Sequence, residues 1–259
     1  MAESKTPIVE IRRVSKLFQL QDQTIHALSD ASLTIRKGEF VCLIGASGCG
    51  KSTLMRIIAG FETPSSGEAL MWGRPILGPD PTRGMVFQDY ALFPWLSVRD
   101  NIGFGPQARG LPRVVVKETV DRFIDLVGLA KFANAYPHQL SGGMKQRVAI
   151  ARVLANDAEV VLMDEPFGAL DAMTRERLQD ELLDIWQRTG LTVVFVTHSI
   201  EEAIFLSNRV VVMTPGPGRI ESDNALDLAR PRDVSSPEFN DIRRVLGAKL
   251  HSHHAKKAA

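Results

Sequence analysis

Five apolar residues run directly into a glycine-rich loop in the segment Phe40-Val-Cys-Leu-Ile-Gly45-Ala-Ser-Gly-Cys-Gly-Lys51-Ser52-Thr53. Such an apolar run is typical of a buried strand, and the residues after Lys51 have helical spacing. The loop between them has the pattern G-x-x-x-x-G-K-S, in which glycines let successive backbone N–H groups turn into one concavity. The helix that follows adds the positive end of its dipole. The segment therefore predicts a strand–loop–helix unit that binds nucleotide phosphates.

Two side chains of this loop carry the predicted chemistry. Lys51 supplies a mobile positive charge to the β- and γ-phosphates, and the Ser52 hydroxyl is a hard oxygen ligand for Mg²⁺. The residues expected to bind the nucleotide are Gly45, Ser47, Gly48, Cys49, Gly50, Lys51, Ser52 and Thr53. A phosphate loop alone does not distinguish kinases, GTPases, motor proteins and transporters.

Further short apolar runs alternate with helical segments along the chain. The runs that predict strands are Ile8–Ile11, Gly84–Phe87, Val160–Met163, Val193–Val196 and Val210–Met213. Helical spacing marks Thr53–Ala59 and Ala172–Thr189, and each of these segments is followed by a glycine. This alternation predicts an α/β fold with a mainly parallel sheet.

One long stretch interrupts the alternation. Between about residues 90 and 156 no strand pattern is present, and Val116, Val120 and Ile124 fall on one face of a helix. We therefore expect a helical subdomain inserted into an α/β core. The predicted divisions are a core at about 1–89 and 157–224, the helical subdomain at about 90–156, and a tail at about 225–259 with a short helix over Glu238–Leu246.

Composition limits the class of protein. The 259 residues carry a formal net charge of +1, which does not favour a nucleic-acid-binding protein. No apolar run reaches the roughly 20 residues that cross a bilayer, and the N-terminus lacks the apolar segment of a secretory signal. The two cysteines, Cys42 and Cys49, give no disulfide framework. These features indicate a cytoplasmic protein.

An acidic pair follows a second apolar run. Asp164 and Glu165 come directly after Val160–Met163. A buried strand that ends in two acids can bring the first carboxylate near the phosphate loop, where it holds Mg²⁺ directly or through water. The next residue can then reach an attacking water as a general base. The pair indicates a hydrolase once it shares a chain with the loop.

A second glycine-bearing helix start lies in Leu140-Ser-Gly-Gly-Met-Lys-Gln-Arg147. Ser141 is placed as an N-cap, and Gly142 and Gly143 leave the helix N-terminus bare of side chains, which makes another anion site. One nucleotide does not need two such helix starts from one small domain. The segment resembles the signature of ATP-binding-cassette (ABC) proteins. This resemblance implies that Ser141, Gly142 and Gly143 complete the ATP site of a second subunit in a head-to-tail dimer.

The resemblance extends from Ile8 to about Asp233 and assigns further residues. It implies that Gln88 contacts Mg²⁺ and the attacking water, that Asp171 belongs to a loop crossing to the other subunit, and that His198 contacts the γ-phosphate. It places Phe18 against adenine. The implied fold is a P-loop (RecA-like) core with an N-terminal antiparallel β element and the inserted helical subdomain. Gly168 and Ser199 depart from the residues usual in the family, but neither change removes a catalytic group.

Several segments are similar to the nitrate, sulfonate and taurine importer group. They are Gly78-Pro79 with Arg83-Gly84, Leu92-Phe93-Pro94-Trp95, Asp100–Gly105, Asp164–Ala172 and Pro217–Ile220. The likeness implies an ATP-hydrolysing subunit with ATP and Mg²⁺ as cofactors. Its implied partners are transmembrane permease subunits, a second copy of itself or a paralogue, and, indirectly, a periplasmic solute-binding protein. The implied location is peripheral, on the cytoplasmic face of the inner membrane.

Two other classes stay open at this point: a soluble ABC ATPase of translation or DNA maintenance, and the cassette of an exporter. The segment after Gln88 gathers large apolar residues without a helix or strand period. The resemblance implies that Phe93 and Trp95 help form a groove for a short helix of the membrane subunit. The alternative is that they line the core of the helical subdomain.

Overall fold

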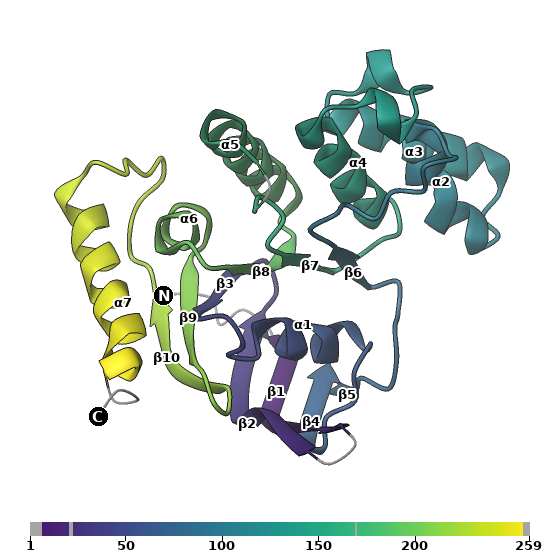
Figure 1. Ribbon diagram of the computed structural model, residues 1–259. Coiled ribbons are helices and arrows are strands. Elements are labelled where there is room, and N and C mark those ends of the chain that lie inside the picture. The colour runs from purple at the N-terminus through teal and green to yellow at the C-terminus, as the bar shows by residue number, and fades with distance from the viewer. Residues whose placement is uncertain (1–6, 21–22, 169, 256–259) are drawn as a thin grey trace. The chain divides into compact units, whose positions relative to one another are not determined.

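The computed structural model describes residues 7–20, 23–168 and 170–255, with side chains as far as residue 250 (Figure 1). The chain forms two compact units. One contains the residues up to Pro79 together with those from Thr192 onward, and the other is Asp80–Leu191. The glycine-rich loop belongs to the first unit, and the acidic pair and the second glycine-bearing helix start belong to the other.

The core of the first unit is a sheet in the strand order β10-β9-β3-β8. Its strands β3 (Phe40–Gly45), β8 (Thr192–Thr197) and β9 (Arg209–Thr214) are parallel, and β10 (Arg219–Ala225) is antiparallel to β9. Every residue of β3 and β8 is buried, as continuous apolar strands of a parallel sheet should be. The predicted α/β class with a mainly parallel sheet is confirmed.

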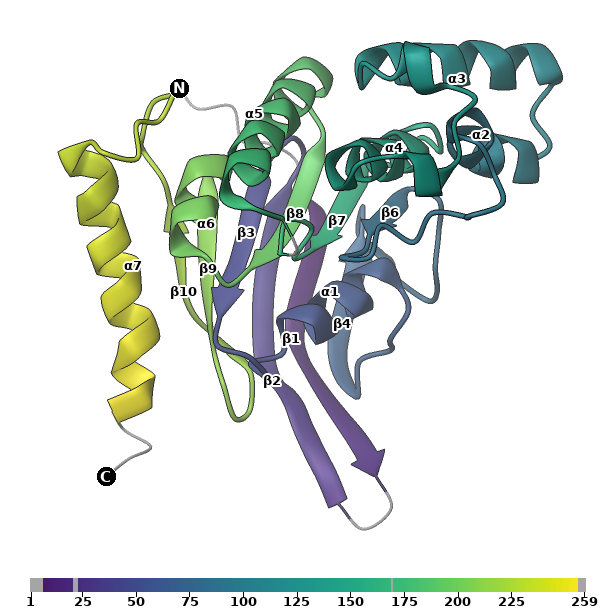
Figure 2. The same ribbon diagram turned by 45° about the horizontal axis from the view of Figure 1, so that its top comes forward.

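The N-terminal antiparallel element is also confirmed. It has the strand order β2-β1-β4-β5, with β1 (Pro7–Leu20) and β2 (Gln23–Arg36) forming the long hairpin of Figure 2, followed by β4 (Ser66–Met71) and β5 (Arg74–Pro75). Helix α1 (Lys51–Ala59) contacts β2 and β4 of this sheet as well as β3 and β8 of the parallel one. The helix that follows the glycine-rich loop therefore packs between two sheets.

Two helices complete the first unit. Helix α6 (Ile200–Leu206) packs on β3 and β8, and α7 (Pro237–Ala255) packs on α6 and β9. Helix α7 is longer than predicted, since it ends at Ala255 rather than Leu246. Its buried residues Phe239 and Leu246 fix it to the unit. None of the described helices combines the length and the apolar character that a membrane span requires.

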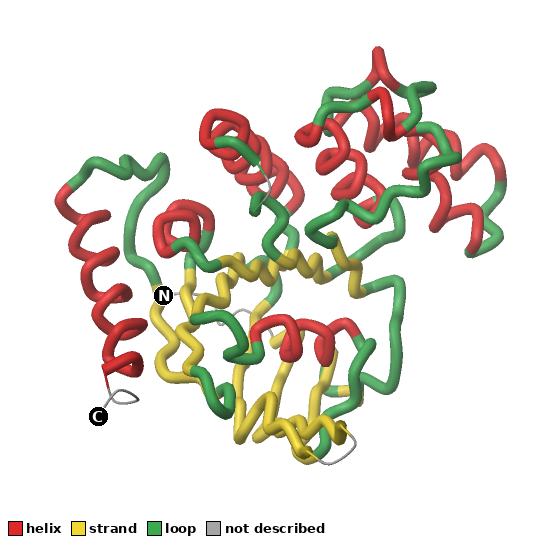
Figure 3. Tube along the Cα trace, in the orientation of Figure 1, coloured by secondary structure: helices red, strands yellow, loops and turns green. Residues whose placement is uncertain are grey.

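The second unit contains the parallel strands β6 (Arg83–Val86) and β7 (Val160–Asp164), and only helices and loops lie between them (Figure 3). Helices α2 (Val98–Ala108), α3 (Arg113–Leu126) and α4 (Gly142–Leu154) pack against one another, with short 3₁₀ turns at Ala130–Phe132 and Pro137–Gln139. Helix α5 (Ala172–Thr189) ends at Gly190, whose φ of 65° is left-handed. A Cβ on Gly84 would lie 2.0 Å from Val153 Cγ1, so glycine permits α4 to approach β6.

Candidate functional site

The glycine-rich loop leaves the start of α1 open. Gly48 and Gly50 have φ of 76° and 88°, in the left-handed region that glycine adopts without strain. Gly50 is the N-cap of α1, and no side chain caps the helix. A helix N-terminus that no side chain caps is the arrangement that binds phosphate.

Neighbouring backbone fixes the shape of this loop. A Cβ on Gly45 would lie 2.5 Å from the Met213 carbonyl oxygen, and one on Gly50 would lie 2.7 Å from the Ala27 carbonyl oxygen. Gly218 N–H donates to the same Ala27 oxygen at 3.2 Å. Because backbone of β9, β2 and the turn at Gly218 lies in contact with it, the loop is held in one conformation.

Lys51 lies beneath the loop, and only 7% of its surface is exposed. Its Nζ donates to the carbonyl oxygens of Gly45 at 2.7 Å and Ala46 at 3.1 Å, and lies 3.7 Å from Cys49 Sγ. These bonds satisfy the buried ammonium. The positive charge is therefore held within reach of any anion that enters the loop. Ser52 and Thr53, in the first turn of α1, are half-buried.

Two other predicted residues belong to this unit. His198 is exposed and directly follows β8, and Ser199 after it caps α6 by accepting from the Glu202 N–H at 3.2 Å. Phe18 is half-buried on β1, opposite Ile25 of β2, and the Lys16 ammonium lies 4.9 Å from the centre of its ring. Phe18 therefore keeps part of its ring surface available for stacking.

In the second unit, the acidic pair occupies the end of β7. Asp164 is the last residue of the strand, and Glu165 has a φ of 46°, which is uncommon for a residue with a side chain. Both are half-buried. Such a backbone conformation costs about 1 kcal/mol or more and gathers at functional sites. The Glu165 carbonyl accepts from the Gly168 N–H at 3.0 Å, which closes the turn after the strand.

Gln88 and Glu165 meet at Gly168. A Cβ at this glycine would lie 3.2 Å from the Gln88 side-chain nitrogen and 3.9 Å from the Glu165 Cβ. The structure thus brings together two predicted catalytic residues from the ends of adjacent parallel strands. Glycine at position 168, where the family usually has serine, leaves room for the Gln88 amide.

Helix α4 begins as a capped helix. Ser141 has φ of −66°, and its Oγ accepts from the Met144 N–H at 3.3 Å, which confirms its predicted place as an N-cap. A Cβ on Gly142 would meet Leu170 Cδ2 at 3.1 Å, and one on Gly143 would meet Leu178 at 3.3 Å. Neither glycine is in the left-handed region, and Gly143 is buried while Gly142 is half-buried.

Asp171 caps the next helix, α5. Its carboxylate accepts from the Thr174 N–H at 3.0 Å, and this hydrogen bond lowers the pKa of Asp171. The side chain is therefore ionised at neutral pH. Its predicted role in a loop that crosses to a second subunit stays a prediction.

The loop after Gln88 depends on two residues that the sequence analysis did not identify. Arg152 of α4 donates to the carbonyls of Ala91 at 2.6 Å and Tyr90 at 3.1 Å, two residues with positive φ. Asn101 is completely buried, and its amide nitrogen donates to the carbonyls of Phe93, Leu96 and Ser97. The sequence did contain one indication for Asn101: it is a polar residue on the same helix face as the apolar Val98 and Ile102.

Phe93 and Trp95 differ in their surroundings. The ring of Phe93 packs 4.5 Å from that of Phe104, with the Arg152 guanidinium 5.5 Å from its centre. Trp95, whose ring lies 5.7 Å from Phe93, is 71% exposed. Phe93 thus contributes to packing within the unit, whereas Trp95 is exposed to solvent.

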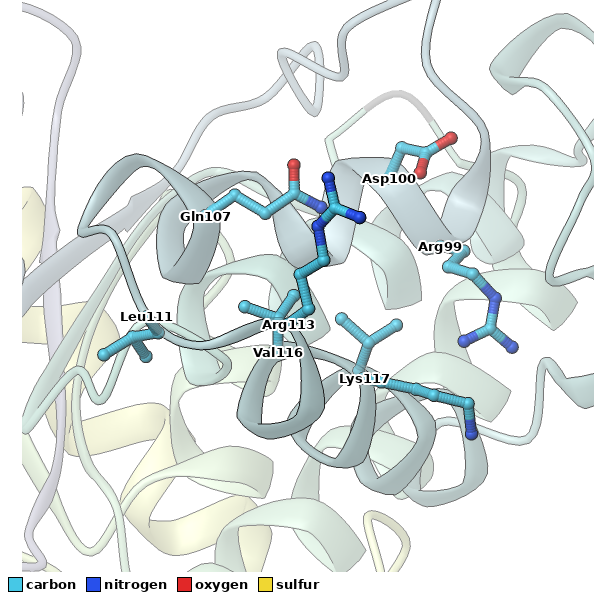
Figure 4. Close-up of a pocket in the computed structure, with 8 residues that line it drawn as sticks. Arg99, Asp100, Gln107, Leu111, Arg113, Val116 and Lys117 are labelled. Atoms are coloured by element: carbon cyan, nitrogen blue, oxygen red, sulfur yellow. The ribbon is translucent and has the colours of Figure 1, made fainter.

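A cavity of about 490 Å³ between α2 and α3 contains none of the predicted site residues (Figure 4). Arg99 and Lys117 line it, and both pair with Asp121, at 2.5 and 2.9 Å. Hydrogen bonds from these two cations lower the pKa of Asp121. Asp121 therefore compensates two of the cations that line the cavity, and Arg113 is a third cation in its lining.

The chain is similar to known proteins over most of its length. Residues 28–168 match a family model described as ABC transporter. The chain is 51% identical to an uncharacterized ABC transporter ATP-binding protein of Methanocaldococcus jannaschii, over 92% of this chain and 89% of that protein. It is 50% identical to a taurine import ATP-binding protein of Roseobacter denitrificans, over 91% of each. It is 47% identical to a nitrate import ATP-binding protein of Synechocystis, over 89% and 86%.

A solved structure is similar over most of the chain. It is a dimeric post-hydrolysis state of an ATP-binding cassette bound to ADP and Pi. It superimposes with a TM-score of 0.73 and 32% identity, covering 86% of this chain and all of the other.

Proposed function

The chain belongs to the ABC transporter family as an ATP-hydrolysing subunit, and we propose that it energises import of a small anion such as nitrate, taurine or another sulfonate. The observation that carries this proposal is 50% and 47% identity to taurine and nitrate import proteins over about nine-tenths of the chain. The relatives' names favour import over export and over a role in translation or DNA maintenance.

Within each subunit, we assign ATP to the loop over Lys51 and Mg²⁺ to Ser52, Asp164 and Gln88. Hydroxyl, carboxylate and amide oxygens are the hard donors that Mg²⁺ prefers, and nucleotide-bound Mg²⁺ takes few protein ligands. The ion would neutralise charge on the phosphates. Among the described residues, no group of three or more His, Cys, Asp or Glu forms a separate metal site.

Four side chains have proposed roles around the nucleotide. Glu165 orients and deprotonates the attacking water, and Gln88 holds the same water from the other side of Gly168. His198 contacts the γ-phosphate, and Phe18 stacks on adenine. The strained backbone of Glu165 supports its assignment, because strain of this kind is retained where a side chain must be aimed.

A complete site requires a second subunit in our proposal. Ser141, Gly142 and Gly143 of one subunit contact the γ-phosphate held by the loop of the other, in a head-to-tail pair with two-fold symmetry, and Asp171 belongs to the loop that crosses. Dimeric structures of a similar cassette support the dimer in this proposal. Hydrolysis removes the phosphate that joins the halves, so the dimer opens.

The remaining partners are permease subunits in the inner membrane, which place the chain peripherally on its cytoplasmic face, and, indirectly, a periplasmic solute-binding protein. We place a permease contact at Trp95, because this exposed ring is continuous with Phe93 and the partly exposed Phe104, and clustered exposed apolar side chains mark interaction sites. Permease co-purification with Trp95→Ser tests this contact, since normal recovery would contradict it.

The importer proposal is tested by uptake in the source cells. Deletion of the gene should abolish uptake of labelled nitrate, taurine or an alkyl sulfonate, and the intact gene, but not a Glu165→Gln copy, should restore it. Normal uptake of all three anions by the deletion strain would contradict the proposal and leave the ATPase assignment untouched.

A further inference from the structure

Helix α6 determines where His198 lies. The helix starts two residues after His198, so a link of His198 and Ser199 joins β8 to α6. The Ser199 N–H donates to Thr197 Oγ1 at 3.0 Å, and Ser199 Oγ caps the helix. At seven residues, α6 is roughly 10 Å long. A tilt at its far end would therefore displace the link that carries His198.

The far end of α6 is held by two arginines of the C-terminal segment, which we call the arginine clamp: Arg230 and Arg232. The last carbonyls of a helix lack partners within the helix. Arg230 donates to the carbonyl of Phe205 at 2.9 Å and to that of Leu206. Arg232 donates to the carbonyls of Ile204 and Ser207. The clamp thus binds the whole last turn.

Burying the guanidinium of Arg232 carries a large free-energy cost of desolvation. Arg232 is 7% exposed, and its hydrogen-bond partners among the described residues are backbone carbonyls, including that of Leu228 at 3.1 Å. Burial lowers the pKa of Arg232 to about 10, so it stays charged at neutral pH. An apolar side chain would fill such a site at less cost in desolvation. The planar guanidinium instead fixes several carbonyls in one geometry.

The same segment also contacts the first turn of α6. Arg243 of α7 lies 3.7 Å from Glu201, and a Cβ on Gly247 would lie 3.7 Å from Ile200 Cδ1. Figures 1 and 2 both show α7 running beside α6. The C-terminal segment therefore supports α6 at both ends, and it does so outside residues 28–168, which match the family model.

We propose that residues 226–250 position His198 for ATP hydrolysis by holding α6 in one orientation, with Arg230 and Arg232 as positioning residues. The inference rests on the proposed contact between His198 and the γ-phosphate. It gives the C-terminal segment a part in turnover, whereas the phosphate loop of Lys51 binds nucleotide without it.

The test compares Arg232→Met with Arg244→Met in the full-length chain. Arg244 is a matched control because its ion pair, with Asp241, lies within α7. We expect Arg232→Met to lower kcat about tenfold while KM for Mg-ATP stays within about twofold, since ground-state binding is untouched. Arg244→Met should retain wild-type values. Arg232→Lys, which keeps the charge, should restore part of kcat.

A double mutant separates positioning from general loosening. If Arg232 acts through His198, adding Arg232→Met to His198→Ala should lower kcat by less than about twofold further, because the two losses are not additive. The proposal is overturned if the fold-reduction of kcat in the double mutant equals the product of those in the two single mutants. It is also overturned if Arg232→Met and Arg244→Met have equal kcat. If Arg232→Met does not fold, the half-buried Arg230→Met gives the same comparison. A wild-type rate for His198→Ala itself would instead overturn the role of His198.

Discussion

The starts of α1 and α4 both carry glycines, yet they are built differently. At α1, Gly48 and Gly50 are left-handed, no side chain caps the helix, and Lys51 lies beneath the loop. At α4, Ser141 caps the helix, and Gly142 and Gly143 have ordinary backbone angles. At the first start no side chain caps the helix and a cation is in place. The second is already capped, and its glycines only clear space around it.

This difference separates two uses of glycine. In the loop before α1, Gly48 and Gly50 are required because their φ angles are left-handed. Gly45 is required because a Cβ there would lie only 2.5 Å from a backbone oxygen. Before α4, an added Cβ would meet side chains and not backbone: Leu170 and the Tyr90 hydroxyl at Gly142, and Leu178 at Gly143. In our proposal, the α1 start is complete as an anion site within one chain, whereas the α4 start contacts a ligand that a second subunit brings.

The largest expected effect is at Lys51. Lys51→Ala removes the charge beneath the loop, so nucleotide affinity of the isolated subunit should fall about a hundredfold or more and turnover should be lost, since charge-assisted bonds to phosphate are the strongest in the site. Lys145→Ala, in the first turn of α4, is the control and should leave affinity within about threefold. Titration with a fluorescent ATP analogue measures both. If both variants lost nucleotide affinity equally, the starts of α1 and α4 would not differ in their contribution to binding.

Glu165→Gln should affect turnover alone. We expect ATP hydrolysis to fall at least about a hundredfold, in line with loss of a general base, while ATP still binds. Because the α4 start then stays engaged, the variant should accumulate as an ATP-bound dimer in size-exclusion chromatography. Glu176→Gln, on the exposed face of α5, is the control. A monomeric variant with ATP bound would argue against engagement of α4 by the partner's nucleotide.

The same substitution at two glycines tests conformation directly. Gly50→Ala forces a left-handed alanine against the Ala27 carbonyl and should lower the free energy of unfolding by about 2 kcal/mol or more. Gly142→Ala needs only a small movement of Leu170 and should change it by less than about 0.5 kcal/mol. Urea denaturation measures both. If Gly142→Ala keeps its stability but loses ATPase activity, the glycine serves an incoming ligand; retained activity would contradict this.

The contrast also marks what the sequence could predict. The loop, the strand before it and the acids after β7 follow from local patterns, and the predicted strand Gly84–Phe87 differs from β6 by one residue at each end. Strands β2 and β10 were missed because polar residues interrupt them, with β10 reading Arg-Ile-Glu-Ser-Asp-Asn-Ala. Arg152 and Arg232 bind carbonyls that are distant in sequence, so no local pattern contains their partners. The carbonyl partners of Asn101 lie within eight residues of it, but in an irregular loop whose path no periodic pattern predicts.

A smaller loss of stability than that of Gly50→Ala is expected at Ser141. Loss of its cap in Ser141→Ala should cost about 1 kcal/mol of stability, which leaves the subunit folded. A mixed dimer places Lys51→Ala in one subunit and Ser141→Ala in the other. If Ser141 acts across the interface, both changes fall in one composite site and the second site is intact, so each mixed dimer should trap one nucleotide after vanadate treatment. If Ser141 acts only within its own chain, both sites are damaged and none should be trapped. The cap hydrogen bond to Met144 is present in either case, so trapping decides whether the α4 start has a ligand beyond its own helix.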